Sequence, residues 1–306
     1  LKPPLWYLAF GSRQPMLGLS SGVALSFFAL LAGSLHVNGP ESGESCPFFQ
    51  KCGEDCLGNL FGRTQMSPEA TQRIDALDPK RRTVWSFSLN EDVSVDIALA
   101  CRFNLTVHLF DPRPSAPEHM RTVQLLLGTM ESTHPMTAPR HEACDDCSSY
   151  WDDVAASHVN VQQLVHHHEA VGAADSNNLT FYETPAGLWS LDRRRSASAG
   201  KTIVVPAVSL LAMMQRMRTQ RLDVVRIKAD RLESTLLEQL IALPQEALPE
   251  VILAELPAYD MWTCTGEVTE CTDWRRTTKA NIKKLVQLGY TQQLFHHMDF
   301  IFLRSH

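Results

Sequence analysis

The sequence lacks an excess of positive charge. Its 306 residues include 28 Lys and Arg against 34 Asp and Glu, which gives a formal net charge of −6. Because binding to a phosphate backbone needs a basic face, this balance argues against a nucleic-acid partner. The triplet Arg193–Arg195 is a local exception, and runs of this kind are usually solvated loops. No internal repeat is found in the sequence.

Charge is absent altogether from the apolar run Met16–Val37, which is long enough to cross a bilayer. Basic residues precede the run and acidic residues follow it, so we expect a cytosolic tail at 1–15 and a translocated remainder. A cleavable signal peptide is the alternative, because the segment Leu31–Ser34 supplies small residues after the apolar core. A buried globular helix is a third reading, although the run has no polar face.

A translocated chain is expected in the endoplasmic reticulum or Golgi as a single-pass membrane protein with a lumenal or extracellular C-terminal domain, or as a secreted protein. The eight cysteines fit a disulfide-forming compartment, and Cys264 and Cys271 predict a local bridge. Cys101 is expected to be a buried thiol. The sequons at Asn104 and Asn178 predict glycosylation if the domain is lumenal.

A tight second pair of metal ligands is also missing. His141, Cys144 and Cys147 have the spacing of zinc ligands, and His158 could be a fourth. Structural zinc sites usually show two tight pairs, and none completes this set. In a lumenal protein a disulfide between the two cysteines is the preferred interpretation, so we predict no metal.

The domain organisation follows from composition. Residues 38–80 are rich in Gly, Ser, Pro and Glu, contain cysteines and are interpreted as a stem or linker, which leaves residues 81–306 as the compact domain. In that domain apolar runs alternate with helical patterns, which predicts an α/β fold with a mostly parallel sheet. We expect strands at 83–88, 106–110, 159–165, 179–182, 203–205, 222–227 and 251–256, helices at 94–103, 120–127, 207–218, 234–243 and 279–288, and a closing antiparallel pair at 290–295 and 300–304.

The stretch Val84–Pro112 predicts a strand–turn–helix–strand unit, the opening of a doubly wound α/β domain. In such sheets ligands bind at the carboxyl ends of the strands. The turn Ser88–Asp92 and the acidic residue Asp111 both come at strand ends. These two places are therefore the first candidates for a ligand site.

The order of the pieces resembles a known family. VWSFSLNEDVSVDIALACRF followed by VHLFDPRP is similar to the opening of FkbM-like S-adenosylmethionine-dependent methyltransferases, and most similar to their membrane-anchored methyltransferase-like branch. Later segments resemble the family in the same order and spacing. These are His168–Gly172, Leu179–Tyr182, Leu222–Ile227, Ile252–Glu255 and Asn281–Tyr290 with Phe302–Arg304, so that the resemblance covers about residues 82–306.

The resemblance implies a Rossmann-like, doubly wound sheet with a C-terminal antiparallel hairpin and S-adenosylmethionine lying across the strand ends. It implies that Asp111 accepts hydrogen bonds from the ribose hydroxyls, a task that suits an acceptor-only carboxylate. It places the donor's amino-acid part and the family's Gly turn at further residues: Ser86, Ser88, Asn90, Glu91 and Gly172. The implied reaction is O-methylation of a glycan or a small hydroxylated acceptor.

Glycines that the family carries are missing from the expected cleft. Ser88 and Asn90 stand where the family usually has glycine, which lets a backbone approach a ligand closely. After the fourth strand the family reads Asp-x-Glu-Gly, and this chain has Lys228, Asp230 and Arg231 at those places. Pro257 also replaces a typical histidine. The alternative interpretation is therefore a catalytically degraded pseudo-methyltransferase that serves as a binding or scaffold module.

No acid–base dyad is evident, and an enzyme of this kind does not need one. Alignment of donor and acceptor can contribute on the order of 7–11 kcal/mol to a displacement reaction. If a general base acts on an acceptor hydroxyl, the candidates are Glu255, Asp230 and His168 within the run His166–His168. Lys228 is expected to form an ion pair with Glu255, which ends a buried strand.

Overall fold

The structure is a computed structural model that describes residues 56–57, 64–78, 82–88, 92–127, 150–172, 178–185, 189–191, 193, 200–229, 231–256, 268–295 and 298–305. The chain divides into two units, Leu1–Asn38 and Gly39–His306, and every described residue belongs to the second. The expected anchor at 16–37 lies outside the described residues. Within those ranges no helix has both the length and the apolar character needed to cross a membrane.

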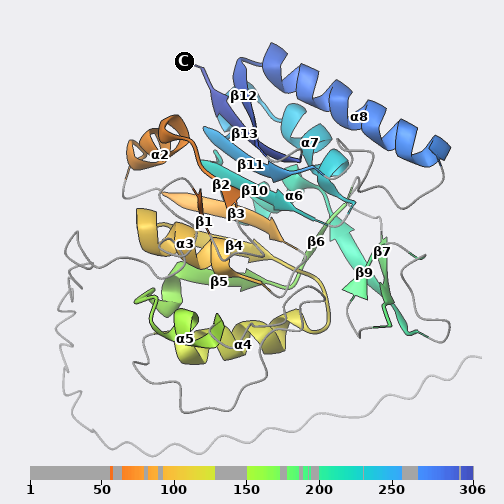
Figure 1. The fold of residues 1–306 in the computed structure, drawn as a ribbon. Helices are drawn as coiled ribbons and strands as arrows, with labels where there is room; N and C mark the ends of the chain where they lie inside the picture. Colours follow the sequence, from red (N-terminus) through yellow and green to blue (C-terminus); the bar gives the residue numbers. More distant parts are fainter. Residues whose placement is uncertain are drawn as a thin grey trace, which may run out of the picture. The chain divides into compact units, whose positions relative to one another are not determined.

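A seven-stranded sheet forms the centre of the domain, in the order β12-β13-β11-β10-β3-β4-β5 (Figure 1). Five strands run parallel, and β13 and β12 are antiparallel to their neighbours. The prediction of a mixed α/β domain with a mostly parallel central sheet is confirmed, and the arrangement is compatible with a Rossmann-like fold. The strands are β3 (Thr83–Ser88), β4 (Thr106–Phe110), β5 (Leu164–His167), β10 (Val224–Lys228), β11 (Val251–Glu255), β12 (Tyr290–Phe295) and β13 (Asp299–Arg304).

The strand order reverses between β3 and β10. From β3 the chain proceeds outward to β4 and β5, and it then returns to place β10 and β11 on the other side of β3. In open α/β sheets the loops at such a reversal diverge and leave a crevice at the carboxyl ends, where ligands bind. A ligand site is therefore expected at the carboxyl ends of β3, β4, β10 and β11.

Helices cover both faces of the sheet (Figure 1). Alternate residues of a strand point to opposite faces, so Val84 belongs to one core cluster and the neighbouring Trp85 to the other. The first cluster includes residues of α2 (Pro68–Asp75), α3 (Ser94–Phe103), α4 (Ala116–Leu126) and α5 (Tyr150–Ala155). The second includes residues of α6 (Leu210–Arg216), α7 (Glu233–Ile241) and α8 (Val268–Gln287).

The segment between β5 and α6 forms a separate four-stranded sheet, in the order β6-β9-β7-β8. Its strands are β6 (Ala170–Val171), β7 (Asn178–Glu183), β8 (Trp189–Ser190) and β9 (Thr202–Val208). The helix predicted over 207–218 is present but shorter, as α6 (Leu210–Arg216), and the prediction that Pro206 enters it is wrong. The strand continues to Val208, and α6 begins after Ser209, whose hydroxyl accepts a hydrogen bond from Ala212 N–H at 3.2 Å.

The strand expected at 159–165 is displaced toward the C-terminus. Asn160 instead forms a capping box with Gln163 and starts a short 3₁₀ helix, Val161–Gln163. Strand β5 follows it and includes His166 and His167. Helix α8 is longer than the helix predicted at 279–288, whereas the boundaries of β3, α3 and β4 are as predicted.

The compact part of the chain begins before Arg81, inside the segment interpreted as a stem. Ser67 caps α2 through a 3.0 Å hydrogen bond from Ala70 N–H to its hydroxyl. Ala70 and Ile74 are fully buried in the first core cluster, and α2 packs against β11 and β13. Residues 64–78 therefore belong to the domain. Two strands of two residues each, β1 (Cys56–Leu57) and β2 (Thr64–Gln65), pair with one another before α2.

Candidate functional site

Asp111, the residue expected to bind a ribose, lies immediately after β4 and is held by Arg113. The Arg113 Nε atom donates to both carboxylate oxygens, at 2.9 and 3.1 Å, and Nη2 donates to Oδ2 at 2.6 Å. The Arg113 backbone N–H donates to Oδ1 at 3.0 Å, so that the Asp-Pro-Arg segment closes as a turn. Both side chains are buried.

This fork-like pairing uses the acceptor capacity of the carboxylate. A carboxylate offers about four lone-pair sites, and Arg113 makes four contacts with those of Asp111. Asp111 lies at the carboxyl edge of the sheet, one strand from the reversal of strand order, and its role in binding a ribose stays a prediction. In this conformation a ribose could reach the carboxylate only by displacing Arg113.

Two histidines, His166 and His119, lie near the Asp111–Arg113 pair. The Nε2 atom of His166 on β5 lies 3.3 Å from the carbonyl oxygen of Asp111. His119 on α4 packs against the rings of Tyr150 and Trp151. Burial, reinforced by the charge of Arg113, lowers the pKa of His119 to about 4, so the ring is neutral at pH 7.

Two buried polar atoms near this pair have no hydrogen-bond partner within the described ranges, Asp92 Oδ2 and His119 Nε2. The other oxygen of Asp92, which precedes the N-cap residue Val93, accepts a 2.9 Å hydrogen bond from Ser94 N–H at the start of α3. Asp92 and Arg113 both influence the charge of His119. The acceptor sites of the Asp111 carboxylate are therefore occupied, whereas one oxygen of Asp92 has no hydrogen-bond partner among the described residues.

Ser86 does not present its hydroxyl to the edge. Ser86 is fully buried, and the Arg226 Nη1 atom lies 3.3 Å from its Oγ and 3.0 Å from Asp96 Oδ2. This triad links β3, β10 and α3 inside the domain, and burial raises the pKa of Asp96 despite the nearby guanidinium. The Ser86 side chain thus supports the first turn of α3 rather than the strand ends.

Lys228 and Glu255 form the expected ion pair at the ends of β10 and β11, with Nζ and Oε2 2.8 Å apart. Their side chains are 25% and 26% exposed, so solvent reaches both groups. Glu255, a candidate general base, is thus paired with an ammonium group. His168, another candidate, lies beyond β5 with its ring in an edge-to-face contact with His166.

Arg231 stands where the resemblance expects glycine, and its backbone φ is +81°. Such a value is uncommon for residues other than glycine. The Arg231 guanidinium lies 5.5 Å from the ring centroid of Trp274 on α8. The loop after β10 therefore has a backbone conformation suited to glycine, with an arginine in it.

Gly172 is required by close packing. A Cβ atom at this position would lie 2.6 Å from the Cβ of Ala207. Its N–H donates to Val208 O at 2.9 Å and its carbonyl accepts from Gln239 Nε2 at 2.8 Å. These contacts account for the glycine through packing of β6 on β9, and a role in donor binding stays a prediction.

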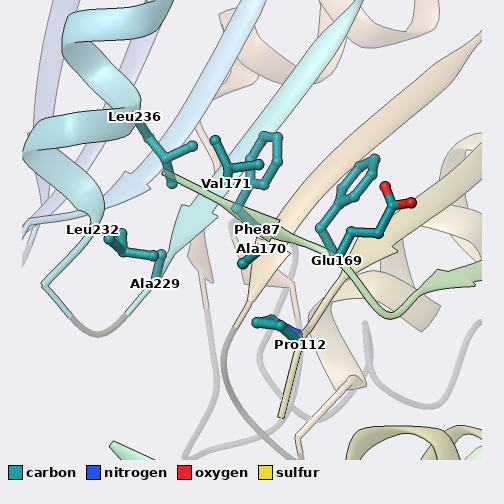
Figure 2. A pocket seen from close by; sticks show the side chains of 9 residues that line it. Phe87, Pro112, Glu169, Ala170, Val171, Ala229, Leu232 and Leu236 are labelled. Atoms are coloured by element: carbon teal, nitrogen blue, oxygen red, sulfur yellow. The ribbon is translucent and has the colours of Figure 1, made fainter. Parts of the chain in front are cut away.

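A shallow apolar pocket opens at the ends of β3 and β4, between β6 and α7 (Figure 2). It is lined by Phe87, Phe110, Pro112, Glu169, Ala170, Val171, Ala229, Leu232 and Leu236. The rings of two lining residues, Phe87 and Phe110, stack with centroids 5.0 Å apart. Glu169 supplies an acidic group to this lining and forms an ion pair with Arg216.

Several predicted site residues lie outside the described residues, namely Asn90, Glu91 and Asp230, together with the side chain of Ser88. The same holds for His141, Cys144, Cys147 and Cys264. In the part of the chain that the structure describes, no group of three or more His, Cys, Asp or Glu side chains is arranged to hold a metal ion. Cys101, expected to be buried, is partly exposed and packs against the first core cluster.

Sequence reasoning missed the roles of Arg113 and Arg226. Arg226 had a usable signal, because an arginine inside the apolar strand VVRIK needs a buried acid and Asp96 is the acid inside the apolar helix SVDIALA. For Arg113 the only signal in the sequence was its position two residues after Asp111. Neither a family model nor a curated protein matches the chain.

Proposed function

We propose that this protein is an S-adenosylmethionine-dependent methyltransferase with a Rossmann-like fold that O-methylates a glycan or a small hydroxylated acceptor. The observation that carries the proposal is the sheet order, which reverses between β3 and β10 and places Asp111 at the same edge, one strand away. The positive φ of Arg231, where the resembled family has glycine, supports the same assignment.

Asp111 would hold the ribose hydroxyls, and the turn after β3 would lie beside the amino-acid part of the donor. When bound, S-adenosylmethionine supplies an activated methyl group. The acidic residue fits this ligand in position, and its oxygens become available when Arg113 leaves them. The contribution of the chain is to bind, align and exclude water, which are the main sources of rate in such a displacement.

Glu255 is the described candidate base that lies at the edge beside the switch point. It can accept a proton from an acceptor hydroxyl with the oxygen that Lys228 does not hold, or after Lys228 Nζ turns toward solvent. Both side chains are about one quarter exposed, which leaves room for that movement. His168 is exposed beyond the end of β5, farther along the same edge.

Calorimetric titration of the full chain with S-adenosylhomocysteine tests the proposal. We expect binding to the unmodified protein and a loss of at least about tenfold in Asp111→Asn, because an amide replaces one acceptor oxygen by a donor. Asp75→Asn, an exposed change in α2, is the matched control and should bind normally. Thermal unfolding of each variant separates loss of binding from loss of folding. No heat of binding at millimolar ligand contradicts the proposal.

A second candidate is a pseudo-methyltransferase that retains the fold as a binding or scaffold module. It is favoured by the saturation of Asp111 by Arg113 and by the Lys228–Glu255 pair, which satisfy the polar groups of the edge internally. The double change Lys228→Asp and Arg231→Gly restores the first and last residues of the pattern Asp-x-Glu-Gly of the resembled family. If this candidate is correct, the double variant should gain S-adenosylhomocysteine binding that the unmodified chain lacks.

A further inference from the structure

We propose that Arg113 determines the ligand preference of the candidate donor site: it exchanges with the ribose hydroxyls on Asp111, and its charge weakens binding of a cationic adenosine ligand relative to a neutral one. This inference rests on the proposed function. It concerns S-adenosylmethionine, whose sulfonium is attached directly to the ribose, and S-adenosylhomocysteine, whose thioether is uncharged.

Arg113 and a bound ribose would compete for the carboxylate of Asp111. Arg113 places a guanidinium Nε and Nη2 on both oxygens of Asp111 within 3.1 Å, and a backbone N–H on one of them. A pair of ribose hydroxyls would need the same oxygens. Because a carboxylate has no acceptor sites beyond these, the ribose and the guanidinium cannot both be bound in full.

After the exchange, Arg113 would need another anionic partner. Arg113 is only 3% exposed, and a buried guanidinium without an anion is costly. Asp92 offers a buried carboxylate oxygen that has no hydrogen-bond partner among the described residues. Asp92 and Arg113 act on the same imidazole, His119, so they lie in one electrostatic neighbourhood. Arg113 therefore has a second carboxylate to approach, and its positive charge stays beside the ribose.

The retained charge of Arg113 would affect the two ligands differently. A positive charge retained near the ribose repels the sulfonium of S-adenosylmethionine and has little effect on the uncharged sulfur of S-adenosylhomocysteine. At separations of several ångströms in a partly buried site, one unit charge changes relative affinity by roughly tenfold. A site with a free carboxylate and no arginine would instead favour the cation.

The experiment compares the two ligands on the full chain by calorimetry, in four forms: unmodified, Arg113→Gln, Arg113→Lys and Arg121→Gln. Arg113→Gln removes the charge and the fork, so we expect it to shift the preference toward S-adenosylmethionine by roughly tenfold. Arg113→Lys keeps the charge without the planar fork, so both affinities should rise with their ratio unchanged. Arg121→Gln removes a charge from the exposed face of α4 and should change neither.

Thermal unfolding checks each variant for folding, and Arg113→Lys tests the exchange even if Arg113→Gln fails to fold. An unchanged ratio in a folded Arg113→Gln protein overturns the charge step. Weaker binding of both ligands by Arg113→Lys overturns the exchange step. In either case the proposed function survives, because the ligands bind. Absence of binding in every form refutes the inference and the proposed function together.

Discussion

Replacing Arg226 by methionine should destabilise the domain strongly, because Arg226 is the counter-ion of a carboxylate that has no access to water. Asp96 is fully buried and Arg226 is 3% exposed. The guanidinium donates to Asp96 Oδ2 at 3.0 Å and contacts the Ser86 hydroxyl at 3.3 Å. The variant keeps an unbranched apolar side chain, shorter than arginine, and removes both contacts.

The magnitude follows from what is left behind. Removing one member of a buried ion pair costs about 3–5 kcal/mol, because an uncompensated charge remains in the interior. Asp96 Oδ1 already has no hydrogen-bond partner within the described part of the chain, and the charge of Asp92 acts against it. Since a domain is stable by only about 5–15 kcal/mol, the loss should consume a large part of the total.

A double-mutant cycle isolates the pair. Urea unfolding followed by circular dichroism gives the free energy of the unmodified chain, Arg226→Met, Asp96→Leu and the double variant. We expect each single change to cost about 3–5 kcal/mol and the double variant to be far more stable than their sum, because an apolar pair of similar volume often replaces a buried ion pair without loss. Asp273→Asn, which breaks the exposed Asp273–Arg276 pair, is the control and should leave the midpoint unchanged.

The pH dependence provides a second readout. Burial already raises the folded-state pKa of Asp96 above its ordinary value, and Arg226 opposes that rise. Without Arg226 the folded protein takes up a proton that the unfolded chain does not, so the stability of Arg226→Met should rise as pH falls through the raised pKa. A cost below about 1 kcal/mol, or two additive single changes, would refute the reasoning.

Three further predictions follow from individual contacts. Gly172→Ala should cost about 1–3 kcal/mol in urea unfolding, because the new Cβ would lie 2.6 Å from the Cβ of Ala207, and adding Ala207→Gly should recover most of the loss. Arg231→Gly should leave the unfolding midpoint equal or higher, because it relieves a φ of +81° while giving up the contact with Trp274; a clear loss would contradict the strain. The stability of the unmodified chain should fall as pH is lowered from about 6.5 toward 4, since burial lowers the pKa of His119 to about 4 in the folded state only, and His119→Gln should flatten that slope in pH-dependent thermal unfolding.

The first strand–helix–strand unit could be predicted to the residue because its signals are local. The apolar runs of β3 and β4 end at polar residues or at Pro112, and α3 ends at Asn104 with φ of +50°. Element boundaries were misplaced where pairing between strands, and not the local sequence, decides where an element ends. Pro206 suggests the first turn of a helix, but it sits in β9 opposite Asn178, and β6 pairs with β9 only from Ala207 onward. The missing N–H of proline is therefore tolerated.

Only part of the candidate site could be predicted from the sequence. The positions of Asp111 and of the Lys228–Glu255 pair follow from strand ends, which an apolar pattern marks. The pairing of Arg113 with Asp111 could not be predicted in this way. Nothing in the order Asp-Pro-Arg distinguishes an arginine that folds back from one that extends into solvent. The direction of Ser86 depends on which face of β3 meets α3, and that requires the register with β10.

The place of β13 affects how the chain can be made. Asp299–Arg304 lies between β11 and β12, and β13 is the last strand of the described chain to be synthesised. While the polypeptide emerges, β11 and β12 cannot adopt their final spacing, and each presents an open edge until β13 arrives. Nascent chains that lack these last residues should therefore be protease-sensitive and prone to chaperone capture, and completion of β13 is the step at which the sheet becomes continuous.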